Sequence, residues 1–382
     1  MAPQSFVLNI PDQDIADLNV RLALTRLPDA APGEPWAFGS SVDYVRDLVA
    51  YWKDRFDWRA QEAALNAFAQ FRVPLSGIDV HYLHVGGVGP NPYPLLLMHG
   101  WPGSVYEFLD IIPRLTDPAR FGGDPRDAFT VIAPSLPGYG LSFRPGQTRF
   151  AIPEMADCLH GLMSEVLGFK TFAVQGGDWG AGVASLIGQK YPASVCGIHL
   201  NLLFAPRDQN VVGSSPEHER YAKQLAHWSK EEIGYQQIQG TKPQTLAFAL
   251  NDSPAGLAAW MVEKFRSWSD CDGVPENAIS RDRMLANISL YWFTGAIGSS
   301  FWPYYGRLHA PRWPISPAEP VTVPTGYAAF PKEIIVPPRE LAAKTYTDIR
   351  RWTVMKKGGH FAAMEQPAAL AEEVFQFFRP LR

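Results

Sequence analysis

Apolar residues in the first 75 positions recur at helical spacing. DQDIADLNVRLALTRLP reads as one helix, and VDYVRDLVAYWKDRFDWRAQEAALNAF continues the pattern with apolar residues at Val42, Val45, Leu48, Val49 and Trp52. Three prolines, Pro28, Pro32 and Pro35, break the chain between these stretches. We find no strand pattern here, so we expect residues 1–75 to form a helical extension that packs against the rest of the chain.

The pattern changes after residue 75. Residues 80–85 alternate between apolar and polar side chains, and short, fully apolar runs follow at 95–98, 129–133 and 171–174. A helical stretch at 154–167 lies before the last run. Strands that alternate with helices predict an α/β fold, with a mostly parallel sheet covered by helices on both faces.

Between residues 205 and 320 the strand pattern stops. Helices are expected at 215–235, 243–250 and 254–268, and the aromatic run SLYWFTGAIGSSFWPYY follows. Strands resume near 322–328 and 352–355, and an amphipathic helix at 368–378 closes the chain. A helical insertion within an α/β chain is most simply a cap over the strand ends. We therefore predict three parts: an extension (1–75), a core (76–204 and 321–382) and a cap (205–320).

The bulk composition excludes several classes of protein. The chain has 382 residues, and its 46% hydrophobic content suits a packed interior of more than one unit. The formal net charge is −4 and no basic block stands out, so we expect no nucleic-acid partner and no binding to an anionic membrane.

The cysteines and the N-terminal stretch suggest a cytoplasmic protein. Three isolated cysteines, Cys158, Cys196 and Cys271, lack the spacing of a disulfide framework or a zinc site. No apolar stretch approaches the roughly 18 residues of a membrane span. MAPQSFVLNIPDQDI has no basic segment followed by an apolar one, so we read no signal peptide.

The segment TFAVQGGDWG carries the clearest chemical motif. Gly176-Gly177-Asp178-Trp179-Gly180 has the small-x-nucleophile-x-small form of a strand-turn-helix elbow, the mark of the α/β-hydrolase fold. Side chains two residues on either side of the nucleophile would collide in that strained turn. A simple helix-capping aspartate is the alternative, but the flanking glycines and the preceding strand favour a nucleophile.

An aspartate in place of serine changes the reaction. A carboxylate that attacks an acyl carbon would form a labile anhydride, so esters and amides are poor substrates. A carboxylate that attacks an sp³ carbon displaces an alkoxide or halide and leaves an alkyl ester, which water can cleave at the carbonyl. The helix that we expect to begin at Ala181 would favour the anionic form of Asp178.

Two backbone donors are expected beside the nucleophile. PLLLMHGWPGS is an apolar strand that ends in a tight loop, and in this fold that loop and the residue after the nucleophile form the oxyanion hole. The candidates are the N–H groups of Trp101 and Trp179. We expect His99 to hold the loop rather than to transfer protons.

The base and its acid lie near the end of the chain. His360, in KKGGHFAAMEQP, follows the last strand pattern, where this fold places its base, and Gly358 and Gly359 would let the loop approach the elbow. Glu333 directly follows the strand before, at the position of the acid. Asp348 is the second choice, because it precedes the last strand and would lie at the other end of the sheet.

These motifs together resemble the microsomal-type epoxide hydrolases. The resemblance extends over nearly the whole chain and rests on HGWPGS, GGDWG, GYQQIQGTKPQT with ALNDSPAGLAAW, YWFTGAIGSS, VPTGYAAFPKE and GGHFAAMEQP. It implies Asp178 as nucleophile, His360 as base and Glu333 as acid. It also implies that two cap tyrosines protonate the epoxide oxygen: Tyr235, and Tyr304 with its neighbour Tyr305 as the alternative.

The resemblance implies hydrolysis of an apolar epoxide to a vicinal diol, with water as second substrate and without metal or organic cofactor. Membrane-bound members of the family carry an N-terminal anchor that this sequence lacks, so we expect a member without a membrane anchor, and a homodimer is an open possibility. Two other functions stay open: a haloalkane dehalogenase, which shares the aspartate nucleophile, and a catalytically silent binding protein.

Overall fold

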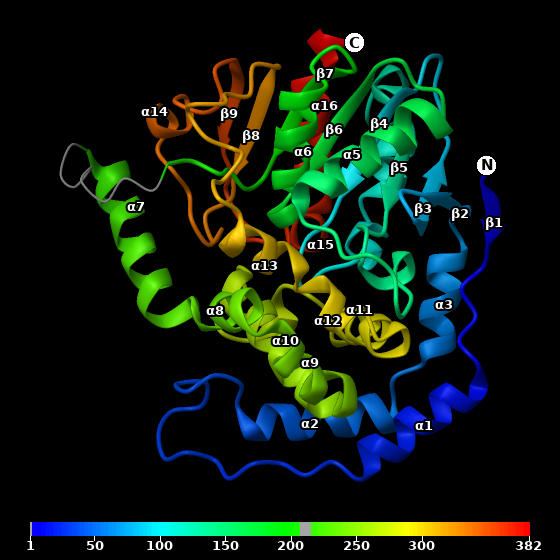
Figure 1. Ribbon diagram of the computed structural model, residues 1–382, viewed down its shortest axis with the longest axis vertical. Helices are drawn as coiled ribbons and strands as arrows, with labels where there is room; N and C mark the ends of the chain where they lie inside the picture. Colours follow the sequence, from blue (N-terminus) through cyan, green and yellow to red (C-terminus); the bar gives the residue numbers. More distant parts are fainter. Residues whose placement is uncertain (1, 207–214) are drawn as a thin grey trace.

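The computed structural model describes residues 2–206 and 215–382, and Figure 1 shows its elements. Within these ranges nine strands form one sheet in the order β1-β2-β3-β5-β4-β6-β7-β8-β9. The pairings β1–β2, β2–β3 and β3–β5 are antiparallel and the other five are parallel, so the predicted mostly parallel sheet is confirmed. The strands are β1 (Gln4–Phe6), β2 (Gln70–Leu75), β3 (Ile78–Val85), β4 (Tyr93–Met98), β5 (Phe129–Pro134), β6 (Phe172–Gly176), β7 (Val195–Leu200), β8 (Thr325–Ala329) and β9 (Ile349–Val354).

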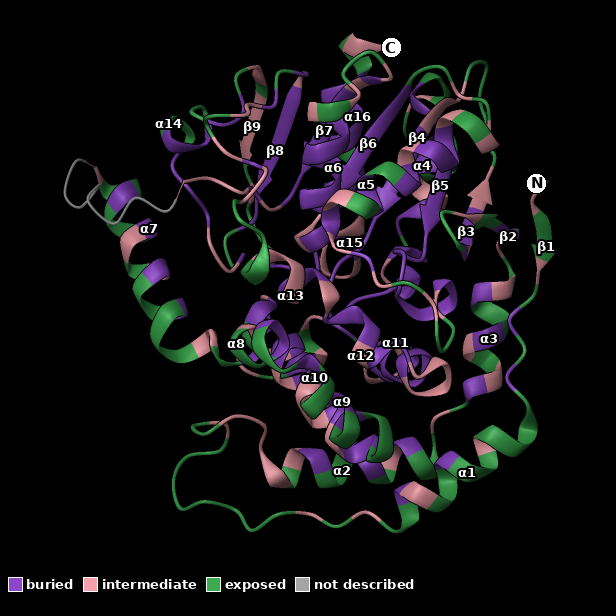
Figure 2. Ribbon diagram, in the orientation of Figure 1, coloured by how far each residue is buried: buried purple, intermediate pink, exposed green. Residues whose placement is uncertain are grey.

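Both faces of the sheet are buried, as Figure 2 shows for its central strands. Successive residues of β4 point to opposite faces, so Leu96 and Met98 belong to one hydrophobic core while Leu95 and Leu97 belong to the other. Helices α5 (Ile152–Gly161) and α6 (Asp178–Lys190) supply the first core. Helices α4 (Ile112–Thr116) and α16 (Pro367–Phe378) supply the second. The continuous apolar runs of the sequence therefore reflect strands covered on two sides.

The predicted cap region is helical. Its described helices are α7 (Pro216–His227), α8 (Gly234–Thr241), α9 (Pro243–Asp252), α10 (Pro254–Trp268), α11 (Arg281–Thr294), α12 (Ile297–Ser300) and α13 (Trp302–His309). Residues 207–214, at the beginning of the predicted cap, lie outside the described residues. Short helices α14 (Arg339–Ala342) and α15 (Ala362–Glu365) belong to the loops of the core.

The N-terminal helices lie against the cap rather than against the sheet. Helices α1 (Asp12–Ala23) and α2 (Val42–Asp54) both contact α10, below the cap in the view of Figure 1. An ion pair of 3.0 Å between Arg21 and Asp252 links α1 to the end of α9. Helix α3 (Trp58–Asn66) then leads the chain to the sheet.

One expectation about the elements was wrong, and one strand was missed. The segment 1–75 contains strands β1 and β2, although we found no strand pattern there, and β7 was not predicted. Strand β1 has only three residues, and β2 contains Pro74 and polar side chains, so pairing with β3 and not local pattern makes it a strand. Over the described ranges, no helix is both long and apolar enough to cross a membrane.

Candidate active site

A tight turn between β6 and α6 carries Asp178. Its φ of +45° lies in the left-handed region that residues other than glycine rarely adopt. The flanking glycines make the turn possible: a Cβ on Gly176 would lie 2.4 Å from backbone atoms of Gly180, and a Cβ on Gly180 would lie 2.4 Å from the Met98 carbonyl oxygen.

Helix α6 begins at Asp178, so the start that we expected at Ala181 was wrong. Glycines have low helix propensity and hide the first turn in the sequence. Asp178 therefore lies within the first turn, where the positive end of the helix favours its carboxylate form.

The loop after β4 supplies a backbone donor to this carboxylate. The N–H of Trp101 donates to Oδ1 of Asp178 at 2.8 Å, and the Trp101–Pro102 peptide bond is cis. The other predicted donor, Trp179, follows Asp178 directly in the first turn of α6. Both predicted donors are thus next to the carboxylate in space or in sequence.

His360 connects Asp178 to Glu333. Its Nε2 lies 3.4 Å from Oδ2 of Asp178, and its Nδ1 lies 2.7 Å from Oε1 of Glu333. The side chains of His360 and Glu333 are 2% and 0% exposed. Burial by itself lowers the pKa of His360, but the carboxylates of Glu333 and Asp178 outweigh it and raise the pKa well above the usual value.

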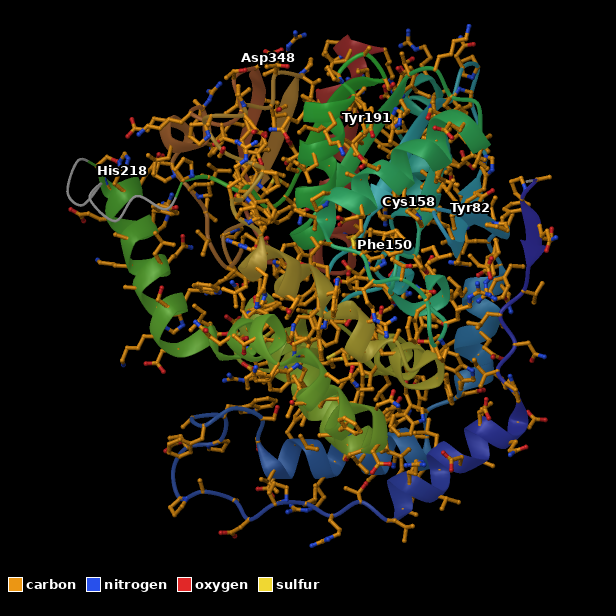
Figure 3. All side chains as sticks on the ribbon, in the orientation of Figure 1. Tyr82, Phe150, Cys158, Tyr191, His218 and Asp348 are labelled. Carbon is orange, nitrogen blue, oxygen red and sulfur yellow. The ribbon has the colours of Figure 1, made fainter. Side chains whose placement is uncertain are left out.

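Asp348, the second choice for the acid, is far from this group. Its carboxylate pairs with Arg350 in front of β9, and its carbonyl oxygen accepts from the N–H of Thr325 at the beginning of β8. Figure 3 shows it at the end of the sheet that faces away from the cap. The structure therefore brings Glu333, and not Asp348, to His360.

Two tyrosines of the cap face each other above Asp178. Tyr235 lies on α8 and Tyr304 on α13, with ring centroids 5.6 Å apart. The ring of Tyr235 stacks on Trp101, and the ring of Tyr304 meets Trp179 edge-on. Burial raises the pKa of both phenols, so both stay protonated at neutral pH.

Tyr305 points elsewhere. Its ring stacks on Trp302 at 4.8 Å and on His309 at 3.9 Å, both on the same helix. Tyr304, by contrast, is 3% exposed, and its hydroxyl makes no hydrogen bond within the described part of the chain.

A pocket of about 300 Å³ opens on Asp178, Tyr235 and Tyr304. Most of its wall is apolar and comes from both core and cap; it includes Trp179, Leu203, Phe204, Trp228, Trp313 and Ile334. A volume of this size and an apolar wall with a few convergent polar groups are typical of a small-molecule site.

Comparisons with known proteins identify the family of this chain. Residues 3–108 match the family model described as epoxide hydrolase N terminus, and residues 93–256 match that of the alpha/beta hydrolase fold. A protein of Stigmatella aurantiaca (strain DW4/3-1) is 42% identical over 99% of this chain and 85% of its own length. Epoxide hydrolase 1 of Oryctolagus cuniculus is 36% identical over 97% of this chain and 88% of its own length. This chain belongs to the epoxide hydrolase family.

Solved structures of epoxide hydrolases share the whole fold. The juvenile hormone epoxide hydrolase of the silkworm Bombyx mori superposes with a TM-score of 0.90 at 28% identity, over 100% of this chain and 95% of that one. The Aspergillus niger epoxide hydrolase has a TM-score of 0.86 at 28% identity, over 100% and 97% of the two chains. The microsomal-type resemblance and the predicted α/β-hydrolase fold are thereby confirmed.

In this epoxide hydrolase His99 has a structural place, as expected. Its Nε2 accepts the N–H of Leu136 at 3.1 Å, and its Nδ1 faces the carbonyl oxygen of Gly100 at 3.0 Å. Burial lowers the pKa of His99 to about 4, so the ring stays neutral.

Sequence reasoning missed the residue that shapes the histidine loop. The carboxylate of Glu365 accepts the N–H groups of Gly359, Phe361 and Asp270 at 2.8–3.0 Å. Burial raises the pKa of Glu365 to about 7. The signal was the single acid of HFAAMEQP, which follows the apolar residues FAAM and lies five residues after His360.

Proposed function

We propose that this epoxide hydrolase converts an apolar epoxide into a vicinal diol, with the carboxylate of Asp178 as the nucleophile. The observation that carries the proposal is that one largely apolar pocket brings together Asp178, Tyr235 and Tyr304. A carboxylate on one side and two phenols on the other match the two ends of a breaking C–O bond.

In the first step, the hydroxyls of Tyr235 and Tyr304 donate hydrogen bonds to the epoxide oxygen. An oxygen of Asp178 attacks a ring carbon, the ring C–O bond breaks, and the new alkoxide takes a proton from one tyrosine. The product is a hydroxyalkyl ester of Asp178. A phenol whose pKa burial keeps high still donates a strong hydrogen bond as negative charge develops on that oxygen.

In the second step, water attacks the carbonyl carbon of Asp178 and gives one proton to Nε2 of His360. Glu333 holds the imidazole through Nδ1 and stabilises its cationic form. The N–H groups of Trp101 and Trp179 stabilise the tetrahedral oxyanion. When the ester bond breaks, the diol takes the proton from His360, and the acid proton left on Asp178 returns to the tyrosinate.

Haloalkane dehalogenation is the second candidate, and one observation favours it. Trp179 lines the same pocket, and its buried indole N–H has no hydrogen-bond partner among the described residues, so a halide bound there could accept from it. The tyrosine pair weighs against this function, because a halide leaves without a proton whereas an epoxide oxygen needs one.

A trapped ester tests the proposal. His360→Gln is mixed with styrene oxide, digested and analysed by mass spectrometry. We expect the peptide with Asp178 to gain the mass of the epoxide and to lose it about 10²–10⁴ times more slowly than in the wild type. Asp178→Asn is the control and stays unmodified. A bromoalkane in place of the epoxide tests the dehalogenase.

Heavy-oxygen water adds an independent readout. With enzyme in excess and a single turnover, the label enters the carboxylate of Asp178 and the first diol carries none. Label in that first diol, or an unmodified His360→Gln protein with several reactive epoxides, would disprove the covalent mechanism.

A further inference from the structure

A second, smaller chamber lies against Asp178. The volume of this chamber is about 20 Å³. One water molecule needs roughly 10–15 Å³, measured in the same way. Asp178 borders both the chamber and the larger pocket, whereas His360 borders the chamber and is not among the residues that line the pocket. The base thus faces the nucleophile on the side of the chamber.

Glu107 brings a second carboxyl group to this chamber. It lies on the short 3-10 helix Val105–Phe108, directly after the loop of Trp101. Its side chain lies across Gly103, because a Cβ on that glycine would fall 1.4 Å from Oε1 of Glu107. Only glycine at position 103 leaves room for the carboxyl group where it is.

The cap holds this loop in place from α11. The hydroxyl of Tyr291 donates to the carbonyl oxygen of Gly103 at 2.7 Å, and the side-chain amide of Asn287 donates to that of Pro102 at 2.7 Å. Both tyrosine and asparagine are buried. The loop that precedes Glu107 is therefore held by two buried side chains of α11.

The carboxyl group of Glu107 has no hydrogen-bond partner from residues 2–206 and 215–382. Glu107 is half-buried and borders the chamber, and apart from Gly177 and Asp178 the other residues that line the chamber are buried. A half-buried carboxyl group without a protein partner is readily satisfied by a water molecule in the chamber.

We propose that Glu107 and His360 together hold the hydrolytic water in this chamber, on the side of Asp178 opposite to the epoxide pocket. The inference rests on the proposed function, since it names the origin of the water that cleaves the ester. Substrate and water then reach the same carboxyl group from two separate spaces.

The bonds made in this step balance with the chain's own groups. One hydrogen of the water lies on Nε2 of His360 and transfers to it as the oxygen bonds to the carbonyl carbon of Asp178. The other hydrogen is held by a carboxyl oxygen of Glu107, which makes no covalent bond and keeps its own protonation state. The carbonyl carbon then releases the alkoxide of the diol, which takes the proton from His360.

Formation of the ester prepares both groups for this task. In the free enzyme burial raises the pKa of Glu107 to about 8, with the His360 cation acting to lower it and the Asp178 carboxylate acting to raise it. The ester removes the negative charge of Asp178. The pKa of Glu107 and that of His360 therefore both fall, which favours the unprotonated form of each, the form that can accept a hydrogen of water.

Rapid-quench mass spectrometry on the full chain separates the two steps. Under single-turnover conditions with styrene oxide, the esterified Asp178 peptide is followed over time. We expect Glu107→Leu to form the ester within about threefold of the wild-type rate and to hydrolyse it about tenfold more slowly or worse, the effect of one lost hydrogen bond to a charged group. Glu107→Gln retains an acceptor and should fall between the two.

Asp110→Asn is the matched control, an acid-to-amide change three residues away. Asp110 is half-exposed, pairs with Arg283 at 2.9 Å and does not border the chamber, so both rates should stay those of the wild type. If Glu107→Leu does not fold, Gly103→Ala replaces it in the experiment. The added methyl group displaces the carboxyl group of Glu107, so ester hydrolysis should slow while ester formation stays near the wild-type rate.

Two results would overturn the inference: ester hydrolysis at the wild-type rate in Glu107→Leu, or ester formation slowed in parallel with hydrolysis. An ester that never appears in any protein, His360→Gln included, would instead refute the proposed function. The two failures are therefore distinguishable.

Discussion

At the scale of single residues, each oxygen of Asp178 has a different partner. Oδ1 accepts the N–H of Trp101, and Oδ2 lies 3.4 Å from the ring of His360. The side chain of Asp178 is 17% exposed, whereas that of His360 is 2% exposed. The pocket thus reaches Asp178 and leaves His360 covered, which suits the proposed reaction, in which the carboxylate must act before the imidazole.

The cap tyrosines give a prediction at this scale. Tyr235→Phe and Tyr304→Phe should each slow ester formation about tenfold or more, because each removes a hydrogen bond to a developing alkoxide, worth roughly 1.5–3 kcal/mol. The double variant should lose about 10²–10⁴. Stopped-flow or rapid-quench measurement of ester formation checks both.

Tyr305→Phe is the control for these variants and should change the rate by less than about twofold, since its ring stacks on Trp302 and His309. A large loss in Tyr305→Phe, with a normal rate in Tyr304→Phe, would show that the wrong tyrosine has been chosen.

At the scale of elements, hydrogen bonds join the end of α10 to the loop that carries His360. The N–H of His360 donates to the carbonyl oxygen of Trp268 at 2.9 Å, and the N–H of Gly358 donates to the carboxylate of Asp270 at 2.9 Å. Gly358 has a φ of +109°, and a Cβ on Gly359 would lie 2.5 Å from the Trp268 oxygen. The cap therefore takes part in placing His360.

Glu365→Gln tests this connection. The amide has one acceptor and brings two N–H groups against backbone donors, so the free energy of unfolding should fall by about 1–3 kcal/mol. Ester hydrolysis should slow more than ester formation. Denaturant unfolding and the two single-turnover rates measure this. Glu372→Gln on the exposed side of α16 is the matched control. Equal slowing of both steps would argue against a role in placing His360.

The contribution of Glu365 to the stability of the fold depends on pH in a defined direction. The folded pKa of Glu365, about 7, lies above the ordinary value of 4.5, so the folded protein holds this proton more tightly than the unfolded chain. Its contribution to stability must fall as the pH rises from about 4.5 to about 7, and the glutamine variant should lack this part of the pH profile. A wild-type and variant difference that is constant with pH would contradict it.

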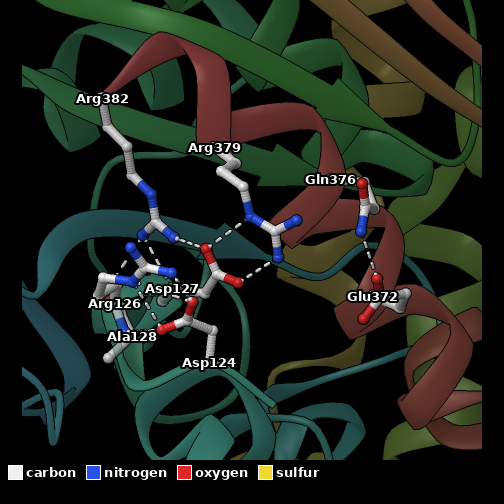
Figure 4. Close-up of polar contacts among 8 residues, drawn as sticks. All are labelled: Asp124, Arg126, Asp127, Ala128, Glu372, Gln376, Arg379 and Arg382. Atoms are coloured by element: carbon white, nitrogen blue, oxygen red, sulfur yellow. Dashed lines mark hydrogen bonds and ion pairs between the residues drawn. The ribbon is translucent and has the colours of Figure 1, made fainter.

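At the scale of the whole molecule, the two ends of the chain pack against elements that are distant in the sequence. The N-terminal helices α1 and α2 pack on α10, and Arg382 at the other end binds the carbonyl oxygens of Asp127 and Ala128, just before β5. Figure 4 shows the contacts of the C-terminal residues: Arg379 and Arg382 both bind the carboxylate of Asp127, which is 5% exposed.

Asp127→Asn should loosen the C-terminus. Two charge-assisted contacts are weakened at a buried site, so the free energy of unfolding should fall by about 1.5–3 kcal/mol while both single-turnover rates stay unchanged. Burial alone raises the pKa of Asp127, but the two arginines outweigh it and hold the pKa below its usual range.

The loss therefore depends on pH in a set direction. The stabilisation is complete above the unfolded pKa of about 3.9 and disappears as the pH falls through the lower folded value. Thermal unfolding of wild type and Asp127→Asn between neutral and acid pH checks this; melting temperatures that converge at high rather than low pH would contradict it.

The sequence alone determined those features of the protein that depend on residues close together in the chain. Asp178 could be recognised because two glycines on one side and one on the other meet a steric demand of the turn, which local sequence must satisfy. The apolar runs of the strands and the helical spacing of the cap were readable for the same reason. The motifs also identified the family, since they are short and contiguous.

Tertiary structure alone decided which distant groups meet. Glu333 rather than Asp348 reaches His360 because it lies at the end of β8 that faces the cap, and Tyr304 rather than Tyr305 faces the pocket because of how α13 is turned. Glu107 and Glu365 gain their surroundings from α11 and from the end of α10. Strands β1 and β2 depend on a partner strand. Burial and long-range pairing, which create these environments, are properties of the packed chain and have no local signature.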